Sequence, residues 1–231
     1  NKANQWVLDR FFIHPVDLPE DASVLDNADK MSEELSLALQ KSKIVTPNAA
    51  IAIPVTSAII RVVTAPLMKD EELQKAIETN SLWENLVQLT DNLDEYSIFH
   101  QVINRNSKTN QMEILFVASK LSDVNSYSSI AKKAGLNPVI MDVRCFTLKN
   151  AYDNTKDKSI TDKVNSAILE LGIDENYLMI NHNNIPRFTD VFLRPQEKQS
   201  LLEITNDQIS NEADSVIRRY SCLLYTSPSP R

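Results

Sequence analysis

Glycine is nearly absent from this chain, and its scarcity limits the folds and sites that the chain can form. The 231 residues include two glycines, Gly135 and Gly172, where average usage of about 7% would supply roughly sixteen. Loops that wrap a phosphate with bare backbone depend on glycine, because a side chain blocks the close approach or the positive φ that they need. A complete P-loop and a GxGxxG dinucleotide loop are therefore excluded, and with them most familiar nucleotide-binding enzymes.

The composition is that of a globular, acidic protein. Hydrophobic residues make up 42% of the chain and charged residues 24%, and the net charge is -7. An acidic chain is a poor partner for nucleic acids and anionic membrane surfaces, which are themselves polyanions. Cys145 and Cys222 lie too far apart for a metal-binding spacing, which argues against a zinc site and a disulfide framework. No apolar run approaches the roughly 18 residues of a membrane span.

The spacing of apolar residues predicts alternating helices and strands. Helices are expected at 28–43, from 70 to about 89 as one element, and at 122–134, 145–152 and 209–220. Strands are expected at 49–55, 58–65, 96–104, 112–119, 138–143, 165–171, 176–181 and 185–191, after a β-rich run at 5–12. Gly135 is expected to end its helix at a position of positive φ, and 153–161 reads as a charged linker.

The sequence lacks the usual patterns of catalytic and metal-binding residues. None of the three histidines, His14, His100 and His182, lies three or four residues from another metal-ligand type. Cys145 has no activating base beside it in the sequence, and we interpret it as a buried small residue. We therefore predict no catalytic residue and no metal site, and whether the protein is an enzyme stays open.

One segment suggests phosphate binding. Glu170, Gly172 and Asp174 fall where one predicted strand turns into the next. In such a hairpin, glycine lets backbone N–H groups approach a phosphate, and an acid at the strand end can orient a metal-bound water. The alternative is a plain β-hairpin without a ligand. We take these three residues as the candidate cofactor-binding set.

Three stretches carry a resemblance to a known family. They are the apolar strand, turn and second strand of 49–61, the strand 113–119, and the run from Ala134 to Leu148. Over residues 35 to 221 the chain resembles the FtsA/PilM group of bacterial actin-like ATPases, and within it most closely the type IV pilus assembly PilM family. It departs from the group in lacking the first phosphate hairpin and the adenosine motif, and in having Glu170 where an Asp is usual.

The resemblance implies an α/β fold with actin-like (ribonuclease-H-like) lobes, an inserted α+β subdomain and an incomplete second lobe. The first lobe is expected at 1–66 and 138–160, the insert at 67–137 and the start of the second lobe at 161–222. The chain is thus expected to be a fragment that lacks both ends of its parent. Residues 223–231 match no structural pattern and resemble a translated sequencing adapter, with a genuine Ser/Pro-rich tail as the alternative.

The resemblance also implies a function. It suggests a cytoplasmic scaffold of type IV pilus or secretion machine assembly, at the inner face of the inner membrane, which it meets only through partners. The expected partner is the cytoplasmic segment of a PilN-like protein, with self-association as a further expectation, and ATP with Mg²⁺ is the family's cofactor. Alternatives are an ATP-hydrolysing or sugar-kinase-type enzyme and an FtsA-like cell-division protein. The residues expected to bind the partner are Val62, Leu67, Val139 and Phe146.

Overall fold

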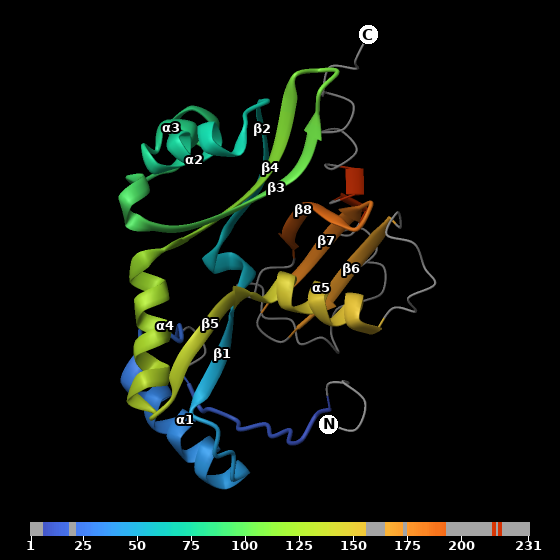
Figure 1. Cartoon of the computed structure of the whole chain (residues 1–231). Helices are drawn as coiled ribbons and strands as arrows, with labels where there is room; N and C mark the ends of the chain where they lie inside the picture. The colour runs from blue at the N-terminus through green and yellow to red at the C-terminus, as the bar shows by residue number, and fades with distance from the viewer. Residues whose placement is uncertain are drawn as a thin grey trace. The chain divides into compact units, whose positions relative to one another are not determined.

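The computed structural model describes residues 7–18, 22–155, 165–172, 175–192, 214–215 and 217–218 (Figure 1). Its contacts divide the chain into two compact units. The first unit contains residues 1–53 and 121–142, and the second contains residues 54–120 and 143–231. Each unit has its own sheets and helices.

The first unit is built from two helices and two strands. Helices α1 (Ala28–Ser42) and α4 (Leu121–Lys133) pack on each other (Figure 1). Strands β1 (Asn48–Ile53) and β5 (Asn137–Val143) form a two-stranded sheet. Gly135 ends α4 with φ +86, as expected for a left-handed helix terminus. The four elements agree with the sequence prediction to within two residues at each end.

The segment before α1 differs from its prediction. Residues 7–12 form no strand, so the expected β-rich run at 5–12 is wrong for its described part. Side chains tie the segment to α1 instead. Arg10 donates to the carbonyls of Ser42 (3.1 Å) and Lys43 (2.7 Å) at the end of that helix, where carbonyls lack helical partners. The His14 Nε2 lies 2.7 Å from the Glu34 carboxylate.

The second unit contains an antiparallel sheet of order β2-β4-β3, formed by β2 (Ile59–Pro66), β4 (Gln111–Lys120) and β3 (Tyr96–Asn106). A short 3₁₀ helix, η1 (Val55–Ser57), precedes β2, and a second, η2 (Leu93–Glu95), precedes β3. Strand β4 is the central strand, and successive residues along most of it are buried, so both of its faces are covered. This explains its nearly unbroken apolar sequence.

Helices α2 (Asp70–Glu78) and α3 (Ser81–Leu86) occupy the stretch that was predicted as one helix. The prediction of a single helix is wrong because the chain turns at Asn80, whose φ is 57, and the hydroxyl of Thr79 donates to the carbonyl of Lys75. Asparagine tolerates this left-handed conformation better than most residues. The acidic first turn of α2 acts as predicted, because Glu72 accepts the backbone N–H of Lys69 at 3.1 Å.

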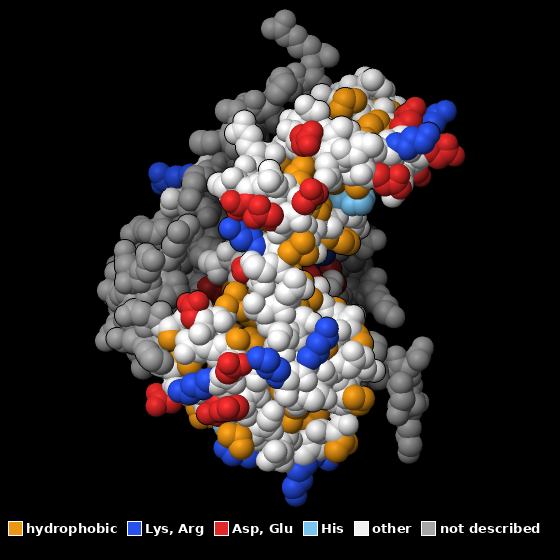
Figure 2. Space-filling view, turned by 90° about the vertical axis from the view of Figure 1, so that its left-hand side faces the viewer, with side chains coloured by type: hydrophobic (Ala, Val, Ile, Leu, Met, Phe, Trp, Pro, Cys, Tyr) orange, Lys and Arg blue, Asp and Glu red, His pale blue; other side chains and the backbone are white. Residues whose placement is uncertain are grey.

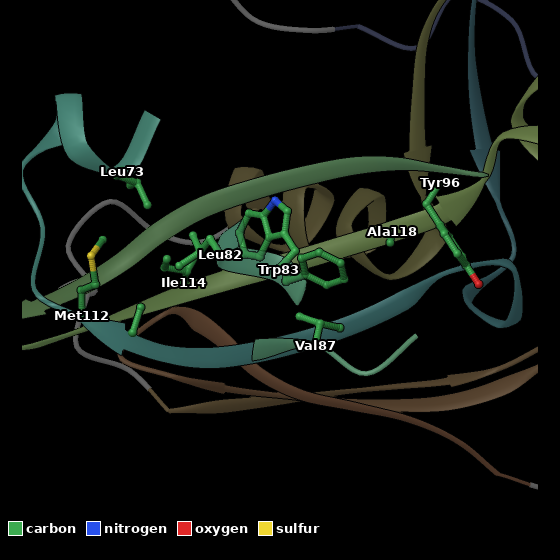
Figure 3. Packing of buried hydrophobic residues seen from close by; sticks show 10 residues of the cluster. Leu73, Leu82, Trp83, Val87, Tyr96, Met112, Ile114 and Ala118 are labelled. Carbon is green, nitrogen blue, oxygen red and sulfur yellow. The ribbon is translucent and has the colours of Figure 1, made fainter. Parts of the chain in front are cut away.

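The break between the helices lets α3 bring Trp83 into the core of this unit. Trp83 is 1% exposed, and its ring lies 5.0 Å from that of Phe116 on β4. Figure 3 shows Trp83 in the middle of the buried cluster. The remaining members of the cluster, all apolar, are Ala65, Leu73, Leu82, Val87, Tyr96, Met112, Ile114 and Ala118.

A second antiparallel sheet in the same unit has the order β6-β7-β8, with β6 (Ser166–Leu171), β7 (Asn176–His182) and β8 (Ile185–Phe192). Asn183 and Asn184, both at positive φ, turn the chain between β7 and β8. Strand β8 lies against β2, and Arg187 on β8 pairs with Glu113 on β4 at 2.9 Å. The two sheets are therefore joined within the unit.

Helix α5 (Arg144–Thr155) precedes the second sheet and is longer than the predicted 145–152. The predicted linker at 153–161 is therefore wrong at its start, where the Asp153 carboxylate pairs with Lys149 one turn earlier at 2.5 Å. The rest of that linker lies outside the described residues. So do the tail 223–231 and most of the helix predicted at 209–220, of which 214–215 and 217–218 are described as helical.

The domain boundaries expected from the sequence stay a prediction. The contacts show that β2, which precedes the expected insert at 67–137, pairs with β4 along its whole length. They also show that α4, which was expected inside the insert, packs on α1 in the first unit. Sheet pairing joins strands that are distant in the sequence, and the spacing of apolar residues does not predict which strands pair.

Replacing Trp83 by alanine should destabilise the second unit by about 3–5 kcal/mol, because the change leaves a large cavity in the core. Urea unfolding followed by circular dichroism measures this loss. Phe99→Ala is the matched control, since Phe99 lies on the same sheet but is 60% exposed; its effect should stay within about 0.5 kcal/mol. Equal losses in the two variants would contradict the assignment of Trp83 to the centre of the core.

Candidate functional site at the Gly172 hairpin

Strands β6 and β7 meet in a narrow turn in which Gly172 has a steric role. Its N–H donates to the carbonyl of Glu175 at 3.2 Å. A Cβ placed on Gly172 would lie 2.8 Å from that same carbonyl oxygen. Glycine is therefore required here for close approach of backbone to backbone within the hairpin.

The carboxylate of Glu175 is buried and bound by groups from distant parts of the chain. Its side chain is 3% exposed. Both of its oxygens accept the N–H of Val55 (3.0 and 2.9 Å), and one also accepts the N–H of Thr56 at 3.3 Å. Arg144, the first residue of α5, lies 3.4 Å from the carboxylate. Glu175 therefore joins η1, α5 and the start of β7.

This role of Glu175 is not apparent from local sequence. Its partner Val55 lies 120 residues earlier. The sequence does indicate a turn after Pro54, and backbone N–H groups of a buried turn need an acceptor. That signal does not say which side chain supplies the acceptor.

Glu170 lies beside a buried phenol. It faces Tyr177 across the β6–β7 pair, and Tyr177 is completely buried. Burial raises the pKa of the Tyr177 phenol well above its ordinary range, and the nearby Glu170 carboxylate adds to the effect because it disfavours a second negative charge. The phenol thus stays neutral, and Cys145 is buried in the same region.

Several groups of this hairpin are engaged within the protein, and its assignment as a cofactor site stays a prediction. The N–H of Gly172 is already engaged by Glu175. Arg144 is paired with the Glu175 carboxylate. Asp174, the third predicted cofactor residue, lies outside the described residues. Within the described ranges, no three His, Cys, Asp or Glu side chains gather as metal ligands would.

The four residues expected to bind a partner are distributed over both units. Val139 lies on β5 in the first unit and is 55% exposed, beside Ile140 at 58%. Val62 on β2 and Phe146 on α5 belong to the second unit and are half-buried. Leu67 packs against the Trp83 cluster. Val139 therefore offers the most apolar surface, and Leu67 has a structural role.

A sequence model of the type IV pilus assembly protein PilM family matches residues 1–198. The chain belongs to this family. A search of curated proteins found no match. Among solved structures, a PilM–PilN type IV pilus biogenesis complex contains a similar chain, with a TM-score of 0.62 and 16% sequence identity. The similarity covers 89% of this chain and 66% of the other, so this PilM-family chain spans just under two thirds of that length.

The cytoplasmic domain of EpsL, an inner-membrane component of the type II secretion system of Vibrio cholerae, is a more distant match. Its TM-score is 0.45 at 9% identity, over 78% of this chain and 63% of that one. The similarity to the PilM–PilN complex shows the fold, and the expected α/β, actin-like fold class is confirmed. None of the described helices has the length and apolar content that a membrane-spanning helix requires.

Removing the Glu175 carboxylate should destabilise the second unit, because Glu175→Ala leaves two N–H groups without an acceptor and Arg144 without its partner. We expect a loss of about 3 kcal/mol in the free energy of unfolding. Glu175→Gln keeps an acceptor oxygen and should lose about 1–2 kcal/mol. Glu71→Ala, an exposed change on α2, serves as the control. Urea unfolding that ranks Glu175→Gln as the more damaging variant would contradict the arrangement.

Alanine and asparagine substitutions should distinguish the roles of the two glycines. Gly172→Ala and Gly172→Asn should both cost about 1–3 kcal/mol, since either Cβ meets the Glu175 carbonyl. At Gly135 nothing lies within 4 Å of an added Cβ. Gly135→Ala should therefore lower the free energy of unfolding by about 1–2 kcal/mol through backbone strain alone. Asparagine should recover part of that loss at Gly135 alone. Recovery by asparagine at Gly172, measured by thermal unfolding, would refute the steric explanation.

Proposed function

We propose that this chain is a component of type IV pilus assembly that docks the cytoplasmic segment of a PilN-like inner-membrane protein. The family match over residues 1–198 carries the proposal. The fold shared with a chain of a PilM–PilN complex supports it. Such a protein works on the cytoplasmic side of the inner membrane and reaches that membrane through its partner.

Strand β5 offers a suitable surface for an extended segment. The sheet of the first unit has two strands, β1 and β5, so β5 keeps an outer edge among the described strands. Val139 and Ile140 expose apolar side chains on β5. An added strand would gain main-chain hydrogen bonds along such an edge and would cover these side chains. We therefore assign Val139 and Ile140 the largest part in docking.

Charge favours the same kind of partner. The chain has a net charge of -7. A segment that precedes a membrane span on the cytoplasmic side is commonly rich in Lys and Arg. Opposite net charges speed the encounter of two partners and favour the correct orientation. On the face displayed in Figure 2, charged side chains of both signs surround exposed apolar ones, which is the mixture that an amphipathic peptide can match.

The proposal assigns no catalysis to this chain. In the described part of the Gly172 hairpin, the Glu175 carboxylate is bound by groups of the protein itself. We therefore place the function in docking. Conformational control by ATP, which the family resemblance implies, would have to use residues beyond those that the structure describes.

A titration tests the docking function. A peptide from the cytoplasmic segment of the PilN-like protein encoded with this chain should shift amide resonances around Val139 at peptide concentrations below about 1 mM. Val139→Asp should abolish these shifts because it places a charge on the apolar surface. Val45→Asp, a change at a 93% exposed residue of the same unit, is the matched control and should leave them unchanged. Shifts confined to residues near Gly172, or none at all, would refute the proposal.

A further inference from the structure

Among the described residues, strand β3 forms an edge of the first sheet in the second unit and pairs with β4 alone. The order β2-β4-β3 places β3 at one edge and β2 at the other. The edge formed by β2 lies against β8. No strand among the described residues pairs with the outer side of β3, which runs for 11 residues. No described strand therefore uses the row of backbone N–H and C=O groups on that side.

This edge lacks the usual protection against pairing with another strand. Natural edge strands are commonly blunted by charged residues, especially Lys, or by Pro and bulges. Between Glu95 and Arg105 the chain has no Asp, Glu, Lys, Arg or Pro. Phe99 lies in the middle of this stretch and is 60% exposed. A bulge interrupts the pairing with β4 only beyond Val102, so the first seven residues of β3 stay regular.

Charges of opposite sign lie at the two ends of β3. Asp94 and Glu95 are exposed just before the strand, and Lys108 is exposed in the turn after it. None of the three forms an ion pair among the described residues. The other charges near the strand are satisfied within the chain, because Lys120 pairs with Asp91 at 2.9 Å and Arg105 pairs with Asp70.

These opposite charges are too far apart to neutralise each other within one copy. A strand rises about 3.4 Å per residue, so the two ends of β3 are separated by roughly 35 Å. The screening length at physiological ionic strength is about 8 Å. A favourable contact between Asp94 and Lys108 therefore requires a second copy of the chain.

We propose that the outer edge of β3 is a self-association surface that pairs with β3 of a second copy in antiparallel orientation. A two-fold axis then joins the two three-stranded sheets into one six-stranded sheet. Antiparallel pairing places the acidic end of each β3 beside the basic end of the other, so the same charge contact forms twice, once at each end of the paired strands. Phe99 gains a cross-strand neighbour and loses exposure.

A second copy explains the surface better than an unrelated peptide does. A peptide could use the backbone edge, but the same chain supplies complementary charges at both ends of the strand without further assumptions. A contact between two strand edges buries less than the roughly 1,200 Å² of a standard stable interface. The association should therefore be weak, with a dissociation constant in the high micromolar range.

Sedimentation equilibrium of the full chain at increasing concentration tests the proposal. The sedimenting mass should rise from monomer towards dimer, and added salt should weaken the association. Phe99→Lys should keep the chain monomeric, because it introduces a charge in the centre of the edge. Leu169→Lys is the matched control, since Leu169 is a 43% exposed apolar residue on an edge strand of the other sheet. It should leave the dissociation constant unchanged, and circular dichroism checks that both variants fold.

Charge exchange then tests the orientation of the two strands. Asp94→Lys alone and Lys108→Asp alone each place like charges together twice in a homodimer, so each should dimerise at least about fivefold more weakly than the parent chain. A mixture of the two variants should recover association, because both contacts in the mixed dimer are then opposite in sign. The double variant Asp94→Lys with Lys108→Asp should also recover it.

Three results would overturn the proposal. A chain that stays monomeric at millimolar concentration has no such surface. Equal weakening by Leu169→Lys and Phe99→Lys would place the contact elsewhere. If neither the mixture nor the double variant recovers association, the copies are not paired antiparallel through β3, and a surface for a different extended partner becomes the better explanation.

Discussion

The buried carboxylate of Glu175 is the constraint on which the second unit depends most. It accepts N–H groups from Val55 and Thr56 and lies beside the guanidinium of Arg144. A carboxylate that is 3% exposed loses most of its hydration, so these donors are needed to offset a penalty of several kcal/mol. The 3₁₀ helix η1, the start of α5 and the residue before β7 are therefore held together by one side chain.

These contacts give a structural role to the hairpin that the sequence suggested as a phosphate site. Gly172 allows two stretches of backbone to approach, and Glu175 uses its charge within the protein. Glu170 is placed beside a neutral, buried phenol. Within the described residues, the hairpin acts as a structural junction.

The two docking surfaces that we propose are strand edges, β5 in the first unit and β3 in the second. Strand β5 exposes Val139 and Ile140 on a two-stranded sheet, where an added strand would supply missing apolar cover. Strand β3 has opposite charges at its ends, which makes it complementary to itself in antiparallel orientation. Both surfaces offer main-chain hydrogen bonds, so side chains decide which partner each accepts.

The sequence by itself determined the local elements and several exclusions. Periods of two and 3.6 residues located nearly all described strands and helices. The scarcity of glycine excluded a complete P-loop and a GxGxxG loop, and Gly135 ends α4 as predicted. Tertiary structure alone decided the turn at Asn80, the pairing of β2 with β4, and the partners of Glu175. The reason is physical: periodicity records which face of an element is buried, whereas a hydrogen bond across 120 residues depends on how the whole chain packs.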